Sequence, residues 1–297
     1  MTDIAIILHG KRGANKVLLD FIAQAEEIPS FSVNIFYTKA QGHARELARN
    51  AKTADVIIAS GGDGTINEVV NGILESGNEQ VRLIIIPTGT GNDFMRTRPC
   101  FSEADKIITQ ILSRNYRTLD VGVISSEGQN YFFLNIADAG FGGSTIHSLN
   151  RIRKVIDREI AYPLAILKTF IRYRKPYIEL NAGGFHYSGP ALMAAFCNGS
   201  CFGNGIFIHP GADPSDGKLN ITLLCKVSLF DYIRYLPKLK KGKRIQHPEL
   251  HYLETTECSI KLLSGTMDIE ADGEVVSLKD PDIRLLPGAL RYIGPEN

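Results

Sequence analysis

Short apolar runs alternate with segments of helical spacing over the first 120 residues. Four runs have the length and β-branched content of buried strands, and four segments between and after them carry apolar residues at helical spacing. The expected strands are residues 4–8, 32–37, 55–59 and 83–86, and the expected helices are residues 16–26, 43–52, 66–74 and 103–112. This alternation predicts a parallel sheet covered by helices, a Rossmann-like α/β nucleotide-binding domain of residues 1–120.

After residue 120 the pattern changes to strands separated mainly by turns. The expected strands are residues 121–124, 131–136, 177–180, 191–196, 219–224, 258–263 and 275–278. Two helical inserts interrupt them, at residues 148–173 and 229–241. The pattern predicts a second domain, residues 121–282, built as an antiparallel β-sandwich.

Composition restricts the class of protein more than it identifies it. The chain has 297 residues and a formal net charge of +1, so no global field selects nucleic acid as a partner. No apolar run reaches the length of a membrane span, and Asp3 interrupts the start of a secretory signal. The five cysteines are scattered; Cys197 and Cys201 lack companion ligands for zinc, so a reducing, cytoplasmic location is expected.

A glycine-rich turn, Gly61-Gly62-Asp63-Gly64-Thr65, joins the third expected strand to the third expected helix. Glycine lets a phosphate approach the backbone, and a helix N-terminus supplies free N–H groups and partial positive charge. The plain alternative is a tight turn in which Asp63 is a solvent-facing cap. An aspartate would repel a phosphate directly, so we expect Asp63 to act through Mg²⁺, a ribose hydroxyl or a proton.

A second loop of the same kind, Pro87-Thr-Gly-Thr-Gly-Asn-Asp-Phe94, follows the next expected strand. Ligands of open parallel sheets lie beyond the carboxyl ends of the strands, so both loops can face one nucleotide. The sequence contains neither the Walker pattern nor a complete Gly-x-Gly-x-x-Gly. This is therefore a nucleotide site of neither common type.

Together the two loops resemble the signature loops of the diacylglycerol kinase/sphingosine kinase-type lipid kinases, bacterial branch. Further stretches, in the same order as in that family, extend the resemblance over almost the whole chain: 198–203, 210–219, 271–274 and 287–291. Gly-Gly-Asp-Gly-Thr alone also occurs in NAD kinases and phosphofructokinases, so the later stretches carry the specificity. The chain departs from the family at residues 9–13, where His9-Gly-Lys-Arg-Gly13 stands in place of an Asn-Pro pair followed by glycine.

The resemblance implies a transferase that uses ATP to phosphorylate a lipid hydroxyl, as in phospholipid metabolism. It implies ATP in a cleft between the two domains, and residues 283–297 returning to the first domain. The residues that it assigns to nucleotide binding are Gly10, Gly13, Thr38, Gly61, Gly62, Asp63, Gly64, Thr65, Ile66, Asn67, Thr90 and Asn92. For Thr38 an ordinary strand-end turn residue is the plain alternative.

Two carboxylates, Asp272 and Glu274, flank a glycine near the C-terminal end. Such a pair can accept the proton of an attacking hydroxyl, and the family places its proposed proton acceptor here. We expect Glu274 to be the acceptor and Asp272 its partner, with Asp63 as the third catalytic residue through Mg²⁺; the opposite assignment within the pair stays open. The plain alternative is an Asp-Gly hairpin turn.

A third acidic segment, Asp213-Pro-Ser-Asp216-Gly-Lys218, mixes carboxylates with carbonyl oxygens in one turn. The family holds a structural Mg²⁺ at the positions that match Asp213, Asp216 and the Lys218 carbonyl, and hard cations prefer such ligands. A plain Asx turn before a strand is the alternative.

The two helical inserts are rich in Lys and Arg. They are either solvated helix faces or an approach surface for an anionic membrane, which would make the enzyme peripheral to the inner face of the membrane. A lipid substrate is the expected partner, and a homodimer is compatible with the sequence. Two rival interpretations are a kinase for a soluble substrate such as NAD and a non-catalytic nucleotide- or lipid-binding regulator.

Overall fold

The computed structural model describes residues 1–152, 158–276 and 278–295. They form two compact units, residues 1–121 with 287–297 and residues 122–286. The sequence had placed the domain boundary after residue 120 and let residues 283–297 return to the first domain. Among the described ranges, no helix is both long enough and apolar enough to cross a bilayer.

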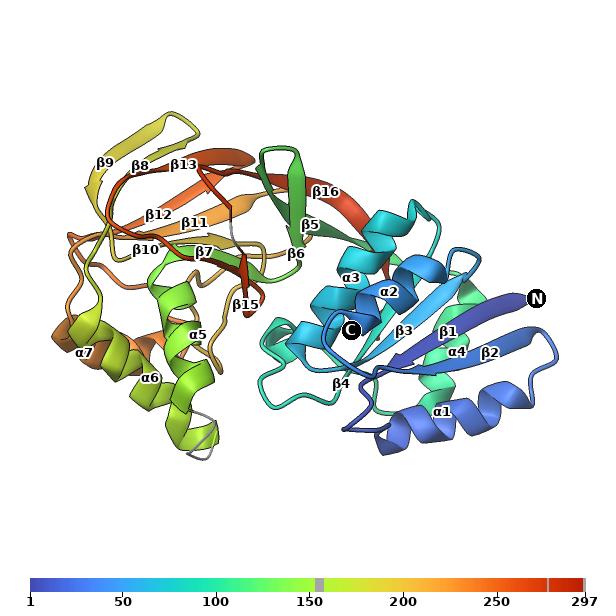
Figure 1. Ribbon diagram of the computed structural model, residues 1–297. Coiled ribbons are helices and arrows are strands. Elements are labelled where there is room, and N and C mark those ends of the chain that lie inside the picture. The colour runs from blue at the N-terminus through green and yellow to red at the C-terminus, as the bar shows by residue number, and fades with distance from the viewer. Residues whose placement is uncertain (153–157, 277, 296–297) are drawn as a thin grey trace. The chain divides into compact units, whose positions relative to one another are not determined.

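The first unit is a parallel sheet between two layers of helices (Figure 1). Its strands β1 (Thr2–Leu8), β2 (Phe31–Tyr37), β3 (Val56–Gly61) and β4 (Arg82–Pro87) lie in the order β2-β1-β3-β4, each pair parallel. Helices α1 (Lys16–Glu26) and α4 (Ala104–Ser113) cover one face, and α2 (His43–Asn50) and α3 (Asp63–Ser76) cover the other. The short 3₁₀ helix η1 (Phe94–Thr97) follows β4.

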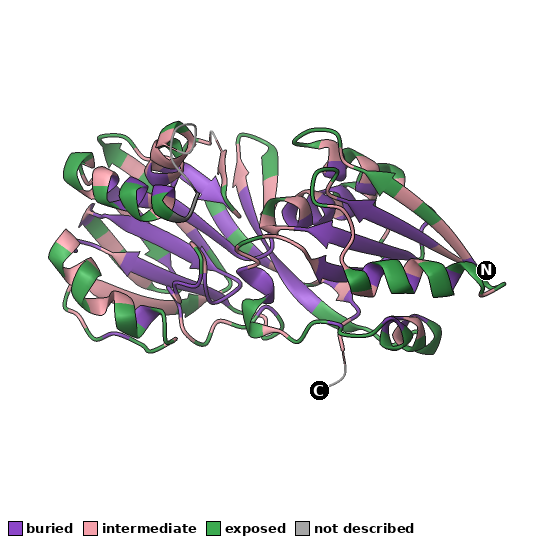
Figure 2. Ribbon diagram, turned by 90° about the horizontal axis from the view of Figure 1, so that it is seen from below, coloured by how far each residue is buried: buried purple, intermediate pink, exposed green. Residues whose placement is uncertain are grey.

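Strands β1, β3 and β4 are buried on both faces because helices cover both, whereas the edge strand β2 is partly exposed (Figure 2). Ile4, Ile6 and Leu8 pack with Leu18 and Phe21 of α1, all essentially inaccessible to solvent. The α/β prediction and all eight expected elements of this unit are confirmed. The one notable shift is α3, which begins at Asp63 instead of residue 66.

The second unit contains two packed sheets. Six antiparallel strands lie in the order β12-β11-β10-β7-β14-β15. Their bounds are β7 (Ile136–Gly140), β10 (Met193–Cys197), β11 (Leu219–Leu224), β12 (Leu250–Thr255), β14 (Ile269–Ala271) and β15 (Glu274–Val276). The facing sheet includes β5 (Arg117–Ser126), β6 (Gln129–Phe133), β8 (Tyr177–Ala182), β9 (Phe185–Pro190) and β13 (Glu257–Ser264). Phe133, Leu180, Phe196 and Ile221 pack together between the sheets, which confirms the sandwich.

Several elements of this unit differ from the prediction. The expected strand 131–136 is two strands, β6 and β7, because the chain bends at Leu134-Asn135. Strands β9, β12 and β14 were not predicted. The expected insert 148–173 is two helices, α5 (Phe141–Ile152) and α6 (Arg158–Arg172); Arg153 and Lys154 lie outside the described residues, as does residue 277 of the expected strand 275–278. The second insert is α7 (Leu229–Leu239).

The last strand, β16 (Asp282–Tyr292), belongs to both units. Its first residues pair antiparallel with β13, and Arg291 and Tyr292 pair parallel with Arg82 and Leu83 of β4. Within the first unit, the Gly288 amide donates to Asp120 Oδ1 at 2.7 Å.

Two carboxylates are buried in the second unit and lie opposite each other across β7 and β14. Asp138 is paired in register with Glu270, and both side chains are inaccessible to solvent. Burial raises the pKa of Asp138 to about 7 and raises that of Glu270 as well, so the pair holds a proton near neutral pH. Its titratable neighbours are Asp268, Asp272, Tyr173 and Cys197.

This pair makes stability depend on pH. Asp138 is ionised in the unfolded chain above its ordinary pKa of 3.8 but protonated in the folded one up to about 7, so the folded chain binds more protons in that window and stability falls as pH rises through it. Asp138→Asn should remove this fall. Urea unfolding followed by circular dichroism at pH 4.5 and 7.5 should show a pH-dependent loss smaller by on the order of 2–4 kcal/mol in the variant. The exposed Asp105→Asn is the control; an Asp138→Asn variant with wild-type pH dependence would contradict the assignment.

Candidate active site

The predicted nucleotide residues gather at one edge of the parallel sheet. Gly10 and Gly13 follow β1, Thr38 follows β2, the glycine turn follows β3, and the Thr90 loop follows β4. Because all four strands are parallel, their carboxyl ends lie at this edge. The structure therefore brings together residues that are up to about eighty positions apart in the sequence.

The loops after β3 and β4 touch through their glycines. A Cβ on Gly89 would lie 2.4 Å from the Gly62 Cα, and a Cβ on Gly62 would lie 3.2 Å from the Gly89 Cα. No side chain larger than hydrogen fits at Gly89. The packing of the two loops against each other therefore requires glycine at this position. The Asn92 side chain, at a residue with φ of 49°, closes the second loop by donating to the Gly89 carbonyl at 2.9 Å.

Arg12 brings a positive charge to this contact. Its guanidinium donates to the Thr88 carbonyl at 3.0 Å, and its Nη1 lies 3.3 and 3.6 Å from the Cβ positions built on Gly89 and Gly62. The loop that carries Arg12 is held to β2, because the Gly10 amide donates to Thr38 Oγ1 at 3.1 Å. The loop 9–13, which lacks the family's Asn-Pro pair, thus delivers a cation to the glycine loops.

Helix α3 begins directly at the turn, with extended Gly62 as its N-cap and no side-chain cap. Its first N–H groups are consequently available to an anion. Ile66 and Asn67 are different: both are buried in α3, the Ile66 amide already donates to the Gly62 carbonyl, and Asn67 accepts from Asn71. These two predicted nucleotide-binding residues are thus buried and hydrogen-bonded within α3.

Asp63 lies between the two loops. Its Oδ1 accepts from the Phe94 amide at 3.4 Å, and a Cβ on Gly91 would lie 3.0 Å from its Oδ2. Burial, and secondarily the nearby Asp93, raise its pKa above the ordinary value. Two buried polar atoms of the same loop, Thr88 Oγ1 and Asn92 Oδ1, have no hydrogen-bond partner in the described protein. Such atoms at a loop edge fit a polar ligand such as a nucleotide.

In the second unit, Asp272 and Gly273 form the two-residue turn of the β14–β15 hairpin, with φ of 48° and 91°. The hairpin alternative was therefore right as a description of the backbone. The Asp272 carboxylate accepts three backbone amides of the β6–β7 bend: Leu134 at 2.7 Å, Asn135 at 3.0 Å and Ile136 at 3.0 Å. These three hydrogen bonds hold the hairpin turn against the β6–β7 bend.

Glu274 has a different environment. It is half-buried, and its Oε2 accepts from the Tyr131 hydroxyl at 2.8 Å. On the other side of the turn, the Gly273 amide donates to Glu270 Oε2 at 2.9 Å, which links the turn to the buried Asp138–Glu270 pair. Sequence reasoning missed Tyr131, Asp138 and Glu270, although a carboxylate inside each of the short apolar runs 136–140 and 269–271 is a visible signal.

The stretch 198–203 supports this bend. The Asn198 side chain donates to the Leu134 carbonyl at 2.6 Å, and the Gly199 amide donates to the Asn135 carbonyl at 2.7 Å. A Cβ on Gly199 would lie 2.0 Å from Asn135 Oδ1, so glycine is required there. The motif acts on the acidic turn through the bend.

The turn with Asp213, Asp216 and Lys218 precedes β11. Asp213 Oδ1 accepts from the Ser215 amide and hydroxyl, and Asp216 Oδ1 accepts from the Lys218 amide, so the turn has the Asx geometry of the plain alternative. The Lys218 ammonium is bound 2.8 Å away by Glu254, which draws it from the turn. Two exposed carboxylates and a carbonyl suit a hard cation. The described residues contain no cluster of three or more His, Cys, Asp or Glu side chains arranged for a metal.

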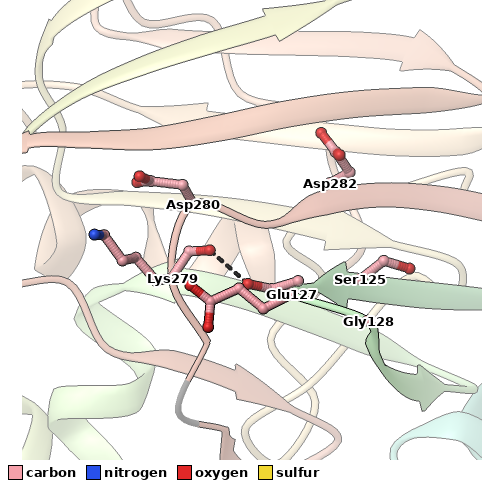
Figure 3. Close-up of a pocket in the computed structure, with 7 residues that line it drawn as sticks. Ser125, Glu127, Gly128, Lys279, Asp280 and Asp282 are labelled. Atoms are coloured by element: carbon pink, nitrogen blue, oxygen red, sulfur yellow. Dashed lines mark hydrogen bonds between the residues drawn. The ribbon is translucent and has the colours of Figure 1, made fainter.

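A polar cavity of ≈ 460 Å³ lies elsewhere in the second unit (Figure 3). It is lined by Ser125, Ser126, Glu127, Gly128, Lys279, Asp280 and Asp282, and Ser126 Oγ donates to the Lys279 carbonyl at 2.6 Å. None of the residues predicted for nucleotide, base or metal lines it, so it is separate from the site that the motifs build.

Comparison with known proteins adds the family. The diacylglycerol kinase catalytic domain matches residues 3–124, and the YegS C-terminal NAD kinase beta sandwich-like domain matches residues 135–294. A "Probable lipid kinase YegS-like" of Pseudomonas savastanoi pv. phaseolicola is 30% identical over 290 residues, covering 96% of this chain and 91% of that protein. The diacylglycerol kinase of Bacillus subtilis is 26% identical over 260 residues, covering 85% and 82%.

Solved structures agree on the fold. A diacylglycerol kinase from Bacillus anthracis has a TM-score of 0.69 at 22% identity, covering 98% of this chain and 96% of that one. Yeast NADH kinase, solved with NADH, has a TM-score of 0.53 at 13% identity, covering 98% and 82%. With both domain profiles matched in order and nearly the whole length aligned, the chain belongs to the bacterial YegS-like and diacylglycerol kinase family of lipid kinases.

Proposed function

We propose that this lipid kinase transfers the γ-phosphoryl group of ATP to the hydroxyl of a diacylglycerol-like lipid, with Mg²⁺ as counter-ion. The observation that carries the proposal is the pair of glycine loops in contact at the carboxyl edge of the sheet, with Arg12 beside them and the uncapped start of α3 behind. Phosphoryl transfer needs phosphates held in position and their charge neutralised, and this edge offers both.

The proposed nucleotide site is formed by residues after four strands. The N–H groups of Asp63, Gly64 and Thr65 and the Arg12 guanidinium face the phosphates, and Thr38, Thr90 and Asn92 contribute side-chain polar atoms. Asp63 would hold Mg²⁺, whose charge would stabilise the transferring group when bound. Burial, and secondarily the nearby Asp93, raise the pKa of Asp63, and a bound cation would favour its ionised form.

The proposed base is Glu274, which would accept the proton of the lipid hydroxyl. Asp272 is a positioning residue: three amides occupy its carboxylate, so it orients the turn on which Glu274 lies. Tyr131 holds the Glu274 carboxylate through its hydroxyl. This division favours Glu274 over Asp272 as proton acceptor, the assignment expected from the sequence.

The proposal is tested with labelled ATP and a total bacterial lipid extract, followed by identification of the labelled product. A phosphorylated lipid is expected, and parallel reactions with NAD should give no product. Phosphorylation of NAD without any lipid product would establish the soluble-substrate alternative, and ATP binding without any product would favour a regulator.

Replacing Arg12 tests the nucleotide site. Arg12→Gln removes the cation beside Gly62 and Gly89 and should weaken ATP binding by about tenfold, since a charge-assisted hydrogen bond contributes about 1.5–3 kcal/mol. Lys16→Gln, which removes an exposed charge at the start of α1, is the matched control. Isothermal titration with a non-hydrolysable ATP analogue measures both, and equal affinities in the two variants would exclude Arg12 from the site.

The two carboxylates of the hairpin should give different variants. Glu274→Gln should lower kcat by about 10²–10⁴-fold, the usual range for a lost general base, with ATP affinity and melting temperature nearly unchanged. Asp272→Asn turns an amide group toward backbone N–H donors and should lower stability by about 2 kcal/mol, a fall of about 5 °C in melting temperature, together with kcat. Wild-type turnover in Glu274→Gln would remove Glu274 from the mechanism.

The Asp213–Lys218 turn is proposed to hold a structural Mg²⁺. Added Mg²⁺ should raise the melting temperature of the wild type, and Asp216→Ala should abolish most of this rise and lower activity. Ser215→Ala, which keeps both carboxylates, is the control. A wild-type Mg²⁺ response in Asp216→Ala would leave the segment as an Asx turn only.

A further inference from the structure

Helix α6 exposes an apolar stripe to solvent. Ile160, Leu164, Leu167 and Ile171 follow one another at spacings of four, three and four residues, which places them on one face of the helix. Ile160 is 62% and Ile171 is 73% exposed. The opposite face is fully used, since Ala161, Ala165, Ile166 and Thr169 are buried. The exposed stripe therefore makes no contribution to the buried core of the unit.

Helix α7 carries a second exposed apolar face and contacts α6. Phe230 is 71% and Ile233 is 59% exposed, one helical turn apart. The helices meet where the Phe170 and Tyr232 rings approach to 5.5 Å between centroids. Figure 1 shows α6 and α7 together on the same side of the six-stranded sheet. A capping box between Ser228 and Asp231 fixes the start of α7.

Positive charge is concentrated on the same two segments. Residues 158–175 contain five basic and one acidic residue, and residues 229–244 contain six basic and one acidic, in a chain whose formal net charge is only +1. In the described part of the chain, no carboxylate forms an ion pair with Arg172, Arg234 or Lys238. Arg234 and Lys238 instead lie over the Tyr235 ring.

We propose that the exposed faces of α6 and α7, which we call the α6–α7 face, dock onto the surface of an anionic lipid bilayer. Apolar side chains rimmed by Lys and Arg are the composition of a helix that lies in a membrane interface, with the apolar residues inserted and the cations at the headgroups. The proposal rests on the proposed function, because a lipid phosphorylated within a bilayer must be reached from its surface.

Charge complementarity selects this occupant. A second copy of the chain seated on the same face by two-fold symmetry would bring two basic rims together, which is unfavourable. An anionic bilayer supplies both a hydrocarbon layer for Ile160, Ile171 and Phe230 and negative charge for the rim. The contact would be reversible, since only a few side chains insert.

The first experiment measures binding without catalysis. Vesicles of phosphatidylglycerol and phosphatidylcholine in equal parts are sedimented with the protein, and phosphatidylcholine vesicles serve as the neutral comparison. The wild type should bind the anionic vesicles, with affinity falling as salt is raised. Ile160→Gln/Ile171→Gln should lower the affinity at least tenfold, and Arg172→Gln/Lys238→Gln about thirtyfold, at about one lost electrostatic contact each.

Matched variants in the first unit control for loss of surface apolar area and charge. Leu19→Gln/Leu112→Gln removes two exposed leucines of α1 and α4, and Arg49→Gln/Lys52→Gln removes two exposed cations near the end of α2. Both should bind vesicles as the wild type does. All the substituted side chains are at or near the surface, so unchanged circular dichroism and melting curves are expected. Equal loss in controls and in α6–α7 variants would overturn the proposal.

The second experiment separates docking from catalysis. A short-chain diacylglycerol dispersed as monomers should be phosphorylated equally by the wild type and by Ile160→Gln/Ile171→Gln, whereas long-chain diacylglycerol in anionic vesicles should be phosphorylated more slowly by the variant. If the variants change vesicle binding as expected but no lipid is phosphorylated, the proposed function is contradicted and the docking proposal stands. Normal turnover on both substrates with unchanged vesicle binding would sink docking alone.

Light scattering identifies the rival occupant. A wild-type dimer that becomes monomeric in Ile160→Gln/Ile171→Gln, with no change in vesicle binding, would show that a second copy covers this face and would overturn the proposal. A molar mass that is the same in wild type and variant, together with the loss of vesicle binding, supports it.

Discussion

The second unit depends on one carboxylate, that of Asp272, which gathers three backbone amides of the bend between β6 and β7. The bend would otherwise leave these donors unpaired in a partly buried place, and one carboxylate accepts all three. Asn198 and Gly199 hold the same bend from its other side. The position of Glu274 is therefore determined by groups distant in the sequence, because its neighbour Asp272 ties the hairpin turn to the bend.

The first unit obeys a steric constraint instead of an electrostatic one. The loops after β3 and β4 meet with only hydrogen atoms at Gly62 and Gly89, which keeps the start of α3 open and leaves room for Arg12. A side chain at Gly89 would overlap the Gly62 backbone, so the loops would have to move apart. The same two residues set the packing at this contact and border the proposed phosphate site.

Elements specified by the local sequence were predicted, whereas features that depend on contacts between distant residues were not. The α/β unit was predictable because its central strands are continuous apolar runs and its helices are amphipathic, so the local sequence identifies each element. The split at Leu134-Asn135 was not, because the hydrogen bonds that hold the bend come from Asp272, Asn198 and Gly199, all more than sixty residues away. The early start of α3 was not predicted either, because Asp63 and Gly64 are weak helix formers. The extended backbone of Gly62 determines where this helix begins. At the site, the residue types indicated two candidate carboxylates, Asp272 and Glu274. Only their hydrogen bonds distinguish Asp272, which anchors the bend, from Glu274.

The path of β16 has a consequence for synthesis of the chain. The parallel sheet of the first unit receives its fifth strand from residues near the C-terminus, where Ile293 is 1% exposed and its amide donates to the Leu83 carbonyl. While a ribosome is still translating the sandwich, the edge of β4 therefore lacks its partner, and Leu83 and its neighbours present an unpaired strand edge to the nascent-chain environment. Completion of the first unit waits for β16 to emerge, so a chain terminated before β16 would expose an aggregation-prone edge in the part that was synthesised first.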